Sequence, residues 1–198
     1  MLEKNTPLEK LIQALQTIPG VGERTAQRMA YHLLCHRDKA NNIAQALHVA
    51  SEQLNHCKMC NNFTLGDICH TCADTKRDAS ILCIVENPSD LNMIENSHGY
   101  HGLYYVLMGA IRPIDGIGPD DLNFSKLMKR IDHPELKEVI VATNFTPEGQ
   151  TTAQHLFDIL KTKVAKVSRI ARGIPMGSEL EYLDAHTVAW AFLDRKDV

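Results

Sequence analysis

The segment EVIVATNFTPEGQTTA, residues Glu138–Ala153, carries the strongest indication of the fold. Its first five residues form an apolar run typical of a buried strand, and ATNFTPEGQ (Ala142–Gln150) follows as a loop. The helical pattern TTAQHLFDILK (Thr151–Lys161) comes next. Strand, loop and helix in this order predict an α/β domain, in which the loop at the carboxyl end of the strand is the usual place for chemistry.

The same alternation extends over most of the chain after Arg77. Ser80–Val85 (SILCIV) also has the pattern of a fully buried strand, and a weaker strand is expected near Leu103–Leu107. Helical patterns separate these strands, at Pro88–Asn96, Asp120–Ile131 and Thr151–Lys161. We therefore expect a mainly parallel sheet covered by helices. Ser178–Leu193 should form a final amphipathic helix or a pair of short helices.

The first part of the chain has helical periodicity instead. Helices are expected at Leu8–Leu15, Glu23–Leu34 and about Lys39–Leu54. In the third of these, Ile43, Leu47 and Leu54 should form the inner face.

The break IPGVG between the first two helices has the composition of a phosphate-binding hairpin. Gly20 and Gly22 permit a tight turn with close backbone approach, and the following helix N-terminus offers free amides to an anion. Arg24 and Arg28 lie one turn apart and could continue along a nucleic-acid backbone. This is the pattern of a helix-hairpin-helix motif that grips DNA without reading its sequence. The alternative is a helical hairpin used only for packing.

Four cysteines lie between these two regions in two CxxC pairs, Cys57-x2-Cys60 and Cys69-x2-Cys72. Two such knuckles can complete a tetrahedron of thiolates around one Zn²⁺. With all four positions filled by protein, the zinc would be structural. The alternatives are a redox pair, unligated core cysteines, or a ligand supplied by His56 or His70 beside the knuckles.

The composition of the 198 residues is that of an ordinary globular protein, with 44% hydrophobic and 23% charged residues. A formal net charge of −3 gives no global attraction to nucleic acid, so DNA binding has to come from local patches. No apolar run reaches the length of a membrane span, and the N-terminus lacks a signal-peptide core. A cytoplasmic location is expected.

These pieces in this order resemble the RecR family of bacterial recombination mediators. The likeness also includes IVENPSD, YHGLYYVLMGAIRPIDGIGPDDL and RIARGIPMGSELEYLDAHTVAWAF, and it runs over nearly the whole chain. It implies that the α/β part is a Toprim domain, that the function is DNA repair with the partner proteins RecO and RecF, and that a ring-like tetramer can encircle DNA. A stable tetramer and a dimer that closes on DNA are the two alternatives for this ring. The fold expected is thus mixed, α+β with α/β. Its parts are a helix-hairpin-helix region (1–55), a zinc finger (57–72), a Toprim domain (80–175) and a C-terminal tail helix (176–198).

Catalytic Toprim domains hold magnesium with a glutamate after the first strand and with an acidic DxD loop. Glu86 matches the glutamate here, but the two DxD positions fall on Asn144 and Thr146, and the final acid falls on Gln150. Only Glu86 and Glu148 remain, too few for efficient metal-assisted phosphoryl transfer. No strong nucleophile is evident either, because Tyr104 and Tyr105 lie in an expected strand and Tyr100 has no neighbouring base. The domain is therefore expected to be non-catalytic.

Three hypotheses follow for the function. The leading one is a non-catalytic, zinc-containing DNA-binding recombination mediator; the others are a magnesium-dependent Toprim nuclease or primase-like enzyme, and an adaptor that touches DNA only through a partner. Glu86 and Glu148 are assigned to a partner surface. The alternative for Glu86 is an exposed carboxylate that caps the helix starting near Pro88. A basic run could line a DNA channel or be a solvated face, and it comprises Lys161, Lys163, Lys166, Arg169 and Arg172.

Overall fold

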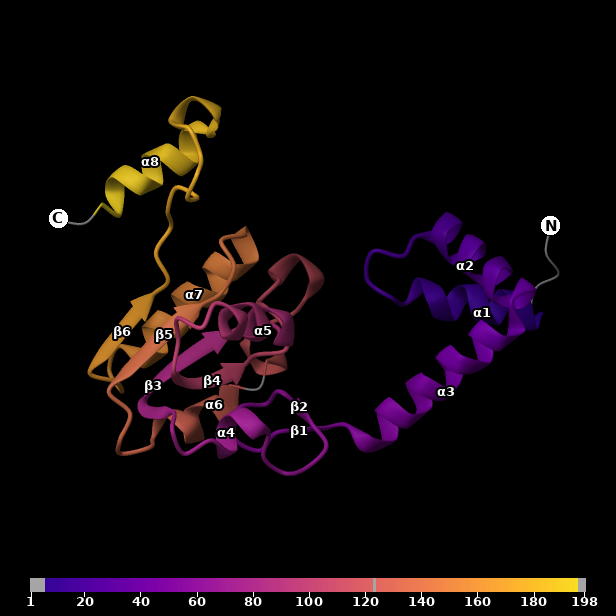
Figure 1. The fold of residues 1–198 in the computed structure, drawn as a ribbon, viewed down its shortest axis with the longest axis horizontal. Helices are drawn as coiled ribbons and strands as arrows, with labels where there is room; N and C mark the ends of the chain where they lie inside the picture. The colour runs from indigo at the N-terminus through magenta and orange to yellow at the C-terminus, as the bar shows by residue number, and fades with distance from the viewer. Residues whose placement is uncertain (1–5, 123, 196–198) are drawn as a thin grey trace. The chain divides into compact units, whose positions relative to one another are not determined.

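The computed structural model describes residues 6–122 and 124–195 (Figure 1). The chain divides into two compact units, Met1–Leu54 and Asn55–Val198. Each unit is described by itself below. No helix in the described part of the chain has both the length and the apolar character needed to cross a membrane.

The first unit consists of the three expected helices. They are α1 (Pro7–Gln16), α2 (Glu23–Cys35) and α3 (Arg37–Gln53). Thr6 starts α1 by accepting a hydrogen bond from the backbone N–H of Glu9 at 3.2 Å. The small core of the unit lies between α1 and α2, where Ile12 packs against Ala26 and Ala30.

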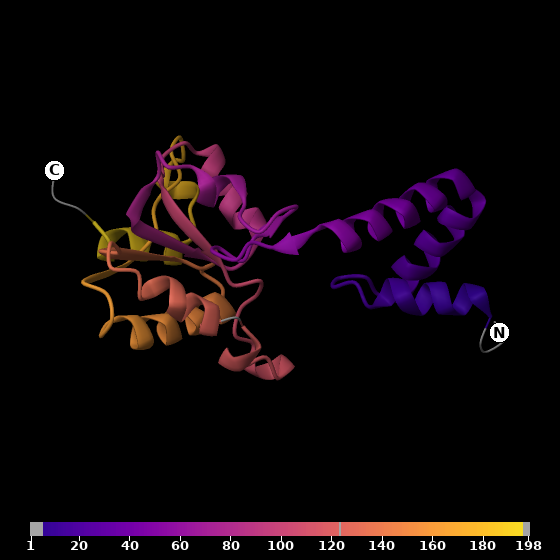
Figure 2. The same cartoon turned by 90° about the horizontal axis from the view of Figure 1, so that it is seen from below.

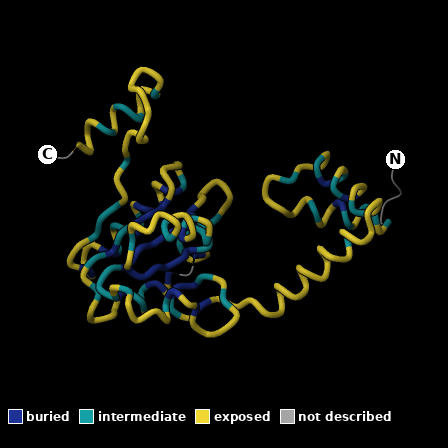
Figure 3. The backbone as a smooth tube through the Cα atoms, in the orientation of Figure 1, coloured by how far each residue is buried: buried dark blue, intermediate teal, exposed yellow. Residues whose placement is uncertain are grey.

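The inner face expected for α3 is not buried within the chain. Ile43 is 48% exposed, Leu47 66% and Leu54 41%, and Figure 3 shows α3 exposed along most of its length. The helix itself is confirmed, but the expectation that these three residues face a core of the same chain is wrong. The reason is that α1 and α2 complete the core between themselves, so that no described residue covers the apolar side of α3.

The second unit begins with the cysteine region. Two short antiparallel strands, β1 (Asn55–His56) and β2 (Phe63–Thr64), form a small hairpin. Helix α4 (His70–Ala73) is a single turn. Cys69 is its N-cap and Cys72 lies within it. The four-stranded sheet follows directly.

All neighbouring strands of this sheet are parallel, in the order β4-β3-β5-β6. The strands are β3 (Asp78–Val85), β4 (Gly102–Val106), β5 (Glu138–Ala142) and β6 (Lys166–Arg169). Helix α5 (Pro88–Asn96) covers one face, while α6 (Phe124–Ile131) and α7 (Pro147–Leu160) cover the other, so the sheet is the middle of three layers (Figure 2). The fold predicted from the alternation of strands and helices is confirmed.

Two helices begin about one turn away from the expected start. Helix α7 begins at Pro147 rather than Thr151, because Thr146 caps it by accepting from the N–H of Gly149 at 3.2 Å. Helix α6 begins at Phe124, because Pro119–Asp121 forms a separate 3-10 turn. The tail consists of a 3-10 turn at Leu180–Tyr182 and helix α8 (Ala185–Leu193), which matches the expected pair of short helices.

Candidate functional site

The four cysteines converge on one point. The Sγ atoms of Cys57, Cys60, Cys69 and Cys72 all lie within 4.8 Å of one another, and three of the four side chains are buried. A tetrahedral zinc–thiolate site, with bonds of about 2.3 Å, needs sulfur–sulfur distances of about 3.8 Å, so only small movements separate this arrangement from ligation. The backbone N–H of Cys69 also points at Cys57 Sγ, at 3.4 Å. The cluster could hold a metal ion.

The ionisation of these thiols supports the same interpretation. Hydrogen bonding from Cys72 lowers the pKa of Cys60 to about 5 against the opposing effect of burial, so one thiolate is stabilised. Burial raises the pKa of Cys69 to about 11, and hydrogen bonding to Cys60 raises the pKa of Cys72. Without a cation, the first thiolate therefore opposes ionisation of its neighbours. A bound cation would remove this conflict because it stabilises all four thiolates together.

Neither histidine beside the knuckles belongs to the group of side chains that could hold a metal ion. The ring Nδ1 of His56 lies 2.9 Å from the carbonyl oxygen of Asn61, and His70 Nε2 lies 3.2 Å from the Thr71 hydroxyl. The arrangement thus favours the four cysteines over the histidine alternatives.

The cysteine knuckle is hydrogen-bonded to the sheet. The backbone N–H of Val106, at the end of β4, donates to the carbonyl of Cys60 at 2.8 Å. The side-chain amide of Asn61 donates to the carbonyl of Val106, also at 2.8 Å. Asn61 has a φ of 64°, in the left-handed region that asparagine tolerates better than most residues. Order in the cluster is therefore linked directly to order at the end of β4.

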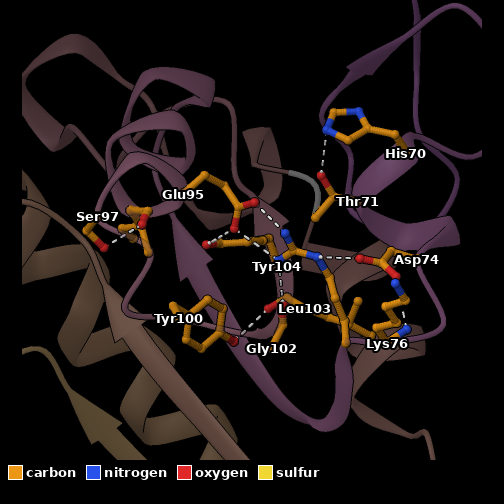
Figure 4. Close-up of polar contacts among 12 residues, drawn as sticks. His70, Thr71, Asp74, Lys76, Glu95, Ser97, Tyr100, Gly102, Leu103 and Tyr104 are labelled. Carbon is orange, nitrogen blue, oxygen red and sulfur yellow. Dashed lines mark hydrogen bonds and ion pairs between the residues drawn. The ribbon is translucent and has the colours of Figure 1, made fainter.

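A second link joins the cluster to the sheet through Arg77, which follows α4. Its guanidinium pairs with both carboxylate oxygens of Glu95 on α5 and donates to the carbonyl of Gly102 at 3.1 Å. Tyr104 on β4 donates its hydroxyl to the same Glu95, and Asp74 lies on the other side (Figure 4). Burial opposes the charge on Glu95, but the hydrogen bonds from Arg77 and Tyr104 prevail and hold its pKa below the usual value.

The tyrosines do not offer a nucleophile. Burial raises the pKa values of Tyr100, Tyr104 and Tyr105, and the hydrogen bond to Glu95 raises that of Tyr104 further. The hydroxyl of Tyr100 donates to the Leu103 carbonyl at 2.8 Å. A nucleophilic tyrosine needs a depressed pKa or a base that takes its proton. The pKa values of these three tyrosines are raised, and the carboxylate beside Tyr104, Glu95, is already ion-paired with Arg77.

The loop expected to carry chemistry lies at the switch point of the sheet. Strands β3 and β5 are neighbours, but β3 leads to β4 on one side and β5 leads to β6 on the other, so a crevice opens at their carboxyl ends. A cleft of about 300 Å³ lies there. Its lining comprises Glu86, Asn87, Ala110, Arg112, Asp115, Asn144, Thr146 and Glu148. The structure therefore brings Glu86 and Glu148 into one cleft, as the Toprim resemblance implies.

In this cleft, Glu86 is already engaged by Asn144. The backbone N–H of Asn144 donates to Glu86 Oε1 and its side-chain amide donates to Oε2, both at 2.8 Å. Gly149 makes this approach possible, because a Cβ there would overlap the Asn144 carbonyl and lie 2.6 Å from Glu86 Oε1. Glu86 is only 5% exposed, so the alternative of an exposed helix cap is wrong. The cap of α5 is Asn87, which forms a capping box with Asp90.

The remaining positions of the loop are occupied by structural contacts. Thr146 caps α7, and the Gln150 side chain donates to the Phe145 carbonyl at 3.3 Å. Arg112 already supplies a positive charge in the cleft. Among the described residues, Glu86 and Glu148 belong to no group of three or more side chains placed to hold a metal ion.

Two arginines beside the cleft belong to this site, although the sequence did not predict their place in it. Arg169 donates to the Asn144 carbonyl at 3.3 Å and lies over the Phe145 ring, 4.6 Å from its centroid. Arg172 lies between Phe145 and Trp190, 3.2 Å from the Trp190 ring centroid, and pairs with Asp194. Trp190 thus anchors the tail helix to the loop after β5. Both arginines are part of the basic run, and nothing in its spacing specifies aromatic partners.

The hairpin between α1 and α2 has the expected geometry. Gly20 has a φ of 81°, which favours glycine, and Gly22 is the N-cap of α2 with no side-chain cap. The surface around both glycines is open, since an added Cβ would meet nothing within 4 Å. Arg24 and Arg28 are exposed on the following helix and form no ion pair within the described chain.

Comparison with protein families gives three matches that follow one another along the chain. Residues 8–51 match the helix-hairpin-helix of RecR, residues 80–171 match the Toprim domain, and residues 173–196 match the C-terminal region of RecR. The cysteine cluster lies between the first two matched regions. This order of a RecR helix-hairpin-helix, a Toprim domain and a RecR C-terminal region is the RecR architecture, and the chain belongs to the RecR family.

Proposed function

We propose that this chain is a DNA-binding recombination mediator in DNA repair that performs no phosphoryl transfer. The observation that carries the proposal is the pair of hydrogen bonds from Asn144 to Glu86. A magnesium ion in this cleft would have to displace an amide donor from the first-strand glutamate. Glu148 is then the second acid of the expected set, and the other acid of the lining, Asp115, pairs with Arg112 at 4.0 Å.

DNA binding is assigned to the hairpin of the first unit. Gly20 and Gly22 leave the backbone amides at the start of α2 open to a phosphate, and Arg24 and Arg28 are exposed on the helix that follows. Contacts of this kind do not distinguish bases, so the binding should be largely independent of sequence. The match to the RecR helix-hairpin-helix supports this assignment.

The metal is assigned as one structural Zn²⁺ per chain, held by Cys57, Cys60, Cys69 and Cys72. Four thiolates in a tetrahedral cluster are the ligand set that zinc prefers in structural sites. The hydrogen bonds from the knuckle to Val106 give the ion a further role, because it would order the end of β4 as well as its own loop.

Self-association and partner binding complete the proposal. The apolar side of α3, which carries Ile43 and Leu47, and the exposed Phe192 and Leu193 of α8 are the kind of surface that a neighbouring copy covers. This supports a dimer or a tetrameric ring. RecO and RecF are the proposed protein partners, with Glu148 at the partner surface and buried Glu86 acting there by fixing the Asn144 loop.

We assign the chain to four parts: DNA binding to 1–55, the zinc finger to 57–72, the Toprim scaffold to 80–175 and the tail helix to 176–198. The division of the chain after Leu54 supports the first boundary. A protein of this function acts on DNA, and we place it in the cytoplasm.

The test combines two measurements on the zinc-loaded protein. Binding to labelled duplexes of unrelated sequence should be similar for all sequences and should weaken steeply with salt. Incubation of supercoiled plasmid with magnesium should leave the plasmid intact. Nicking or relaxation that is lost in Glu86→Ala or Glu148→Ala would establish the nuclease alternative instead. Absence of DNA binding by the protein alone would favour the adaptor that reaches DNA through a partner.

A further inference from the structure

A second basic site lies on the unit that carries the cysteine cluster, far along the chain from the hairpin arginines. It is a pocket of about 400 Å³ between the first cysteine knuckle and helix α6. Its lining comprises His56, Lys58, Met59, Lys126, Lys129 and Arg130. Side chains from two separate elements therefore bring four permanent cations and a histidine to one cavity.

Most of this charge is not neutralised within the chain. Lys58 pairs with Asp67 at 2.7 Å, so it contributes little net attraction. Within the part of the chain that the structure describes, Lys126, Lys129 and Arg130 form no ion pair with an acid. The Nε of Arg130 is buried and has no hydrogen-bond partner there. The Nε atoms of Arg77 and Arg169 share this property, so the place of Arg130 in the pocket lining is what points to an anion.

The spacing of these three residues fits an anion with several oxygen atoms. Lys126, Lys129 and Arg130 are at positions i, i+3 and i+4 of α6, so they share one face of the helix and repel one another until an anion binds. Ammonium and guanidinium groups that converge in this way are typical of phosphate sites. Protein–protein interfaces usually have an apolar centre, and Met59 is the one aliphatic side chain in this lining, so a protein partner fits the pocket less well than an anion.

The rim of the pocket favours a nucleic-acid strand over a free phosphate ion. Phe63 is 50% exposed and its ring lies 5.0 Å from that of His56, which itself lines the pocket. Phe63 is outside the lining and adjoins the pocket through His56. Single-stranded nucleic acids bind where cations hold the backbone and a nearby aromatic ring stacks on a base.

We propose that this pocket is a second DNA contact, in which Lys126, Lys129 and Arg130 bind a backbone phosphate and Phe63 offers a stacking surface to a neighbouring base. The inference rests on the proposed function in that it requires a DNA-binding chain. It adds a site that is independent of Arg24 and Arg28 and that belongs to the other compact unit. The site should therefore favour DNA with single-stranded character.

The test is the double variant Lys126→Ala/Lys129→Ala in the full-length, zinc-loaded protein. Arg130 is left in place because it is partly buried. Fluorescence anisotropy with a labelled duplex and a labelled single strand, over a series of salt concentrations, gives the slope of log affinity against log salt. For each phosphate that the variant no longer binds, the slope should become shallower by about 0.9 on duplex and about 0.7 on single strand. Phe63→Ala should weaken single-strand binding about fivefold and affect duplex binding less.

The matched control is Lys76→Ala/Lys137→Ala, which removes the same charge from two exposed lysines of the same unit outside the pocket. A slope in the pocket variant equal to that of this control would overturn the inference. If Arg24→Ala/Arg28→Ala weakens binding while the pocket variant does not, the proposed function stands and the second site fails. If the wild-type protein binds no DNA, both fail. If inorganic phosphate binds the wild type and the pocket variant keeps its DNA affinity, the pocket is a site for free phosphate and the proposal is refuted.

Discussion

The role of the hydrogen bonds from Asn144 to Glu86 can be tested with the variant Asn144→Asp, which replaces the side-chain amide with a carboxylate. The amide nitrogen that donates to Glu86 Oε2 at 2.8 Å becomes a carboxylate oxygen facing another carboxylate. At that distance, and with an effective dielectric constant of 20, two full charges repel by about 6 kcal/mol. The variant can avoid this repulsion by keeping one proton on the pair.

The proton limits the cost and makes it dependent on pH. Keeping a proton at pH 7 on a carboxyl group whose pKa in the unfolded chain is about 4 costs about 4 kcal/mol, less than the repulsion it avoids. At pH 5 the same proton costs about 1.4 kcal/mol. Since the folded state holds a proton that the unfolded chain has released, the folded pKa is raised, and stability is lost as the pH rises.

The matched control is Asn144→Ala, which removes the side-chain hydrogen bond without adding charge. Its loss of about 1.5–3 kcal/mol should change little between pH 5 and 7. Asn144→Asp should therefore be the less stable variant at pH 7 and the more stable one at pH 5. Urea denaturation of the zinc-loaded protein at the two pH values, without added magnesium, measures this crossing directly.

Magnesium gives a second readout on the same variant. A divalent cation that bridges the two carboxylates should restore about 1.4 kcal/mol of stability when its concentration is ten times its dissociation constant. The wild-type protein and Asn144→Ala should not respond, and no variant should nick plasmid, since no nucleophile is added. If the stability of Asn144→Asp at pH 7 equals that of Asn144→Ala and does not respond to magnesium, our reasoning about the cleft is refuted.

Three further predictions concern the rest of the chain. Purified protein should contain one zinc per chain, and Cys57→Ser should lower stability more than any surface change, because metal binding and folding are coupled; zinc-free protein of unchanged stability would contradict this. The double variant Arg24→Ala/Arg28→Ala should weaken DNA binding equally for all sequences and make the salt slope shallower by about 0.9 per duplex phosphate contact; an unchanged slope would exclude the hairpin. Glu95→Gln should lower the free energy of unfolding by about 1–3 kcal/mol at pH 7, because Arg77 loses its charged partner. The pKa of Glu95 is lowered in the folded protein, so this difference should disappear as the pH falls through that pKa. A difference that persists in acid would argue against the ion pair.

The fold was largely predictable because its determinants are local. The runs SILCIV and EVIVA are buried strands that need no information from elsewhere in the chain, and the prediction for β5 matches its bounds. The start of α7 was missed because PEGQ has the composition of a loop. Its helical state depends on capping by Thr146 and on the fit of Gly149 against Asn144 and Glu86.

The candidate sites were predictable to different degrees. The cysteine cluster could be predicted from spacing, because ligands of one metal come in pairs that a short turn fixes. Which acids were missing from the cleft could also be predicted by comparison with the Toprim pattern. The engagement of Glu86 by Asn144 could not, because these residues are 58 positions apart and meet only through the parallel pairing of β3 and β5. The pocket beside α6 was missed for the same reason, since Lys58 and Lys126 belong to elements that only the fold brings together.

The low charge of the chain bears on how it would hold DNA. With a net charge of −3, attraction to DNA depends on a few local cations, and each exposed contact is weak and screened by salt. Copies joined through the apolar surfaces of α3 or α8 would add their contacts at a high effective concentration, so that several weak sites together bind firmly. Such binding needs neither sequence recognition nor catalysis, and it releases DNA when the assembly opens. The fraction of DNA bound should therefore rise more steeply with protein concentration than binding at a single independent site would. Replacing Leu47 with a charged residue should weaken both assembly and DNA binding while leaving the hairpin intact.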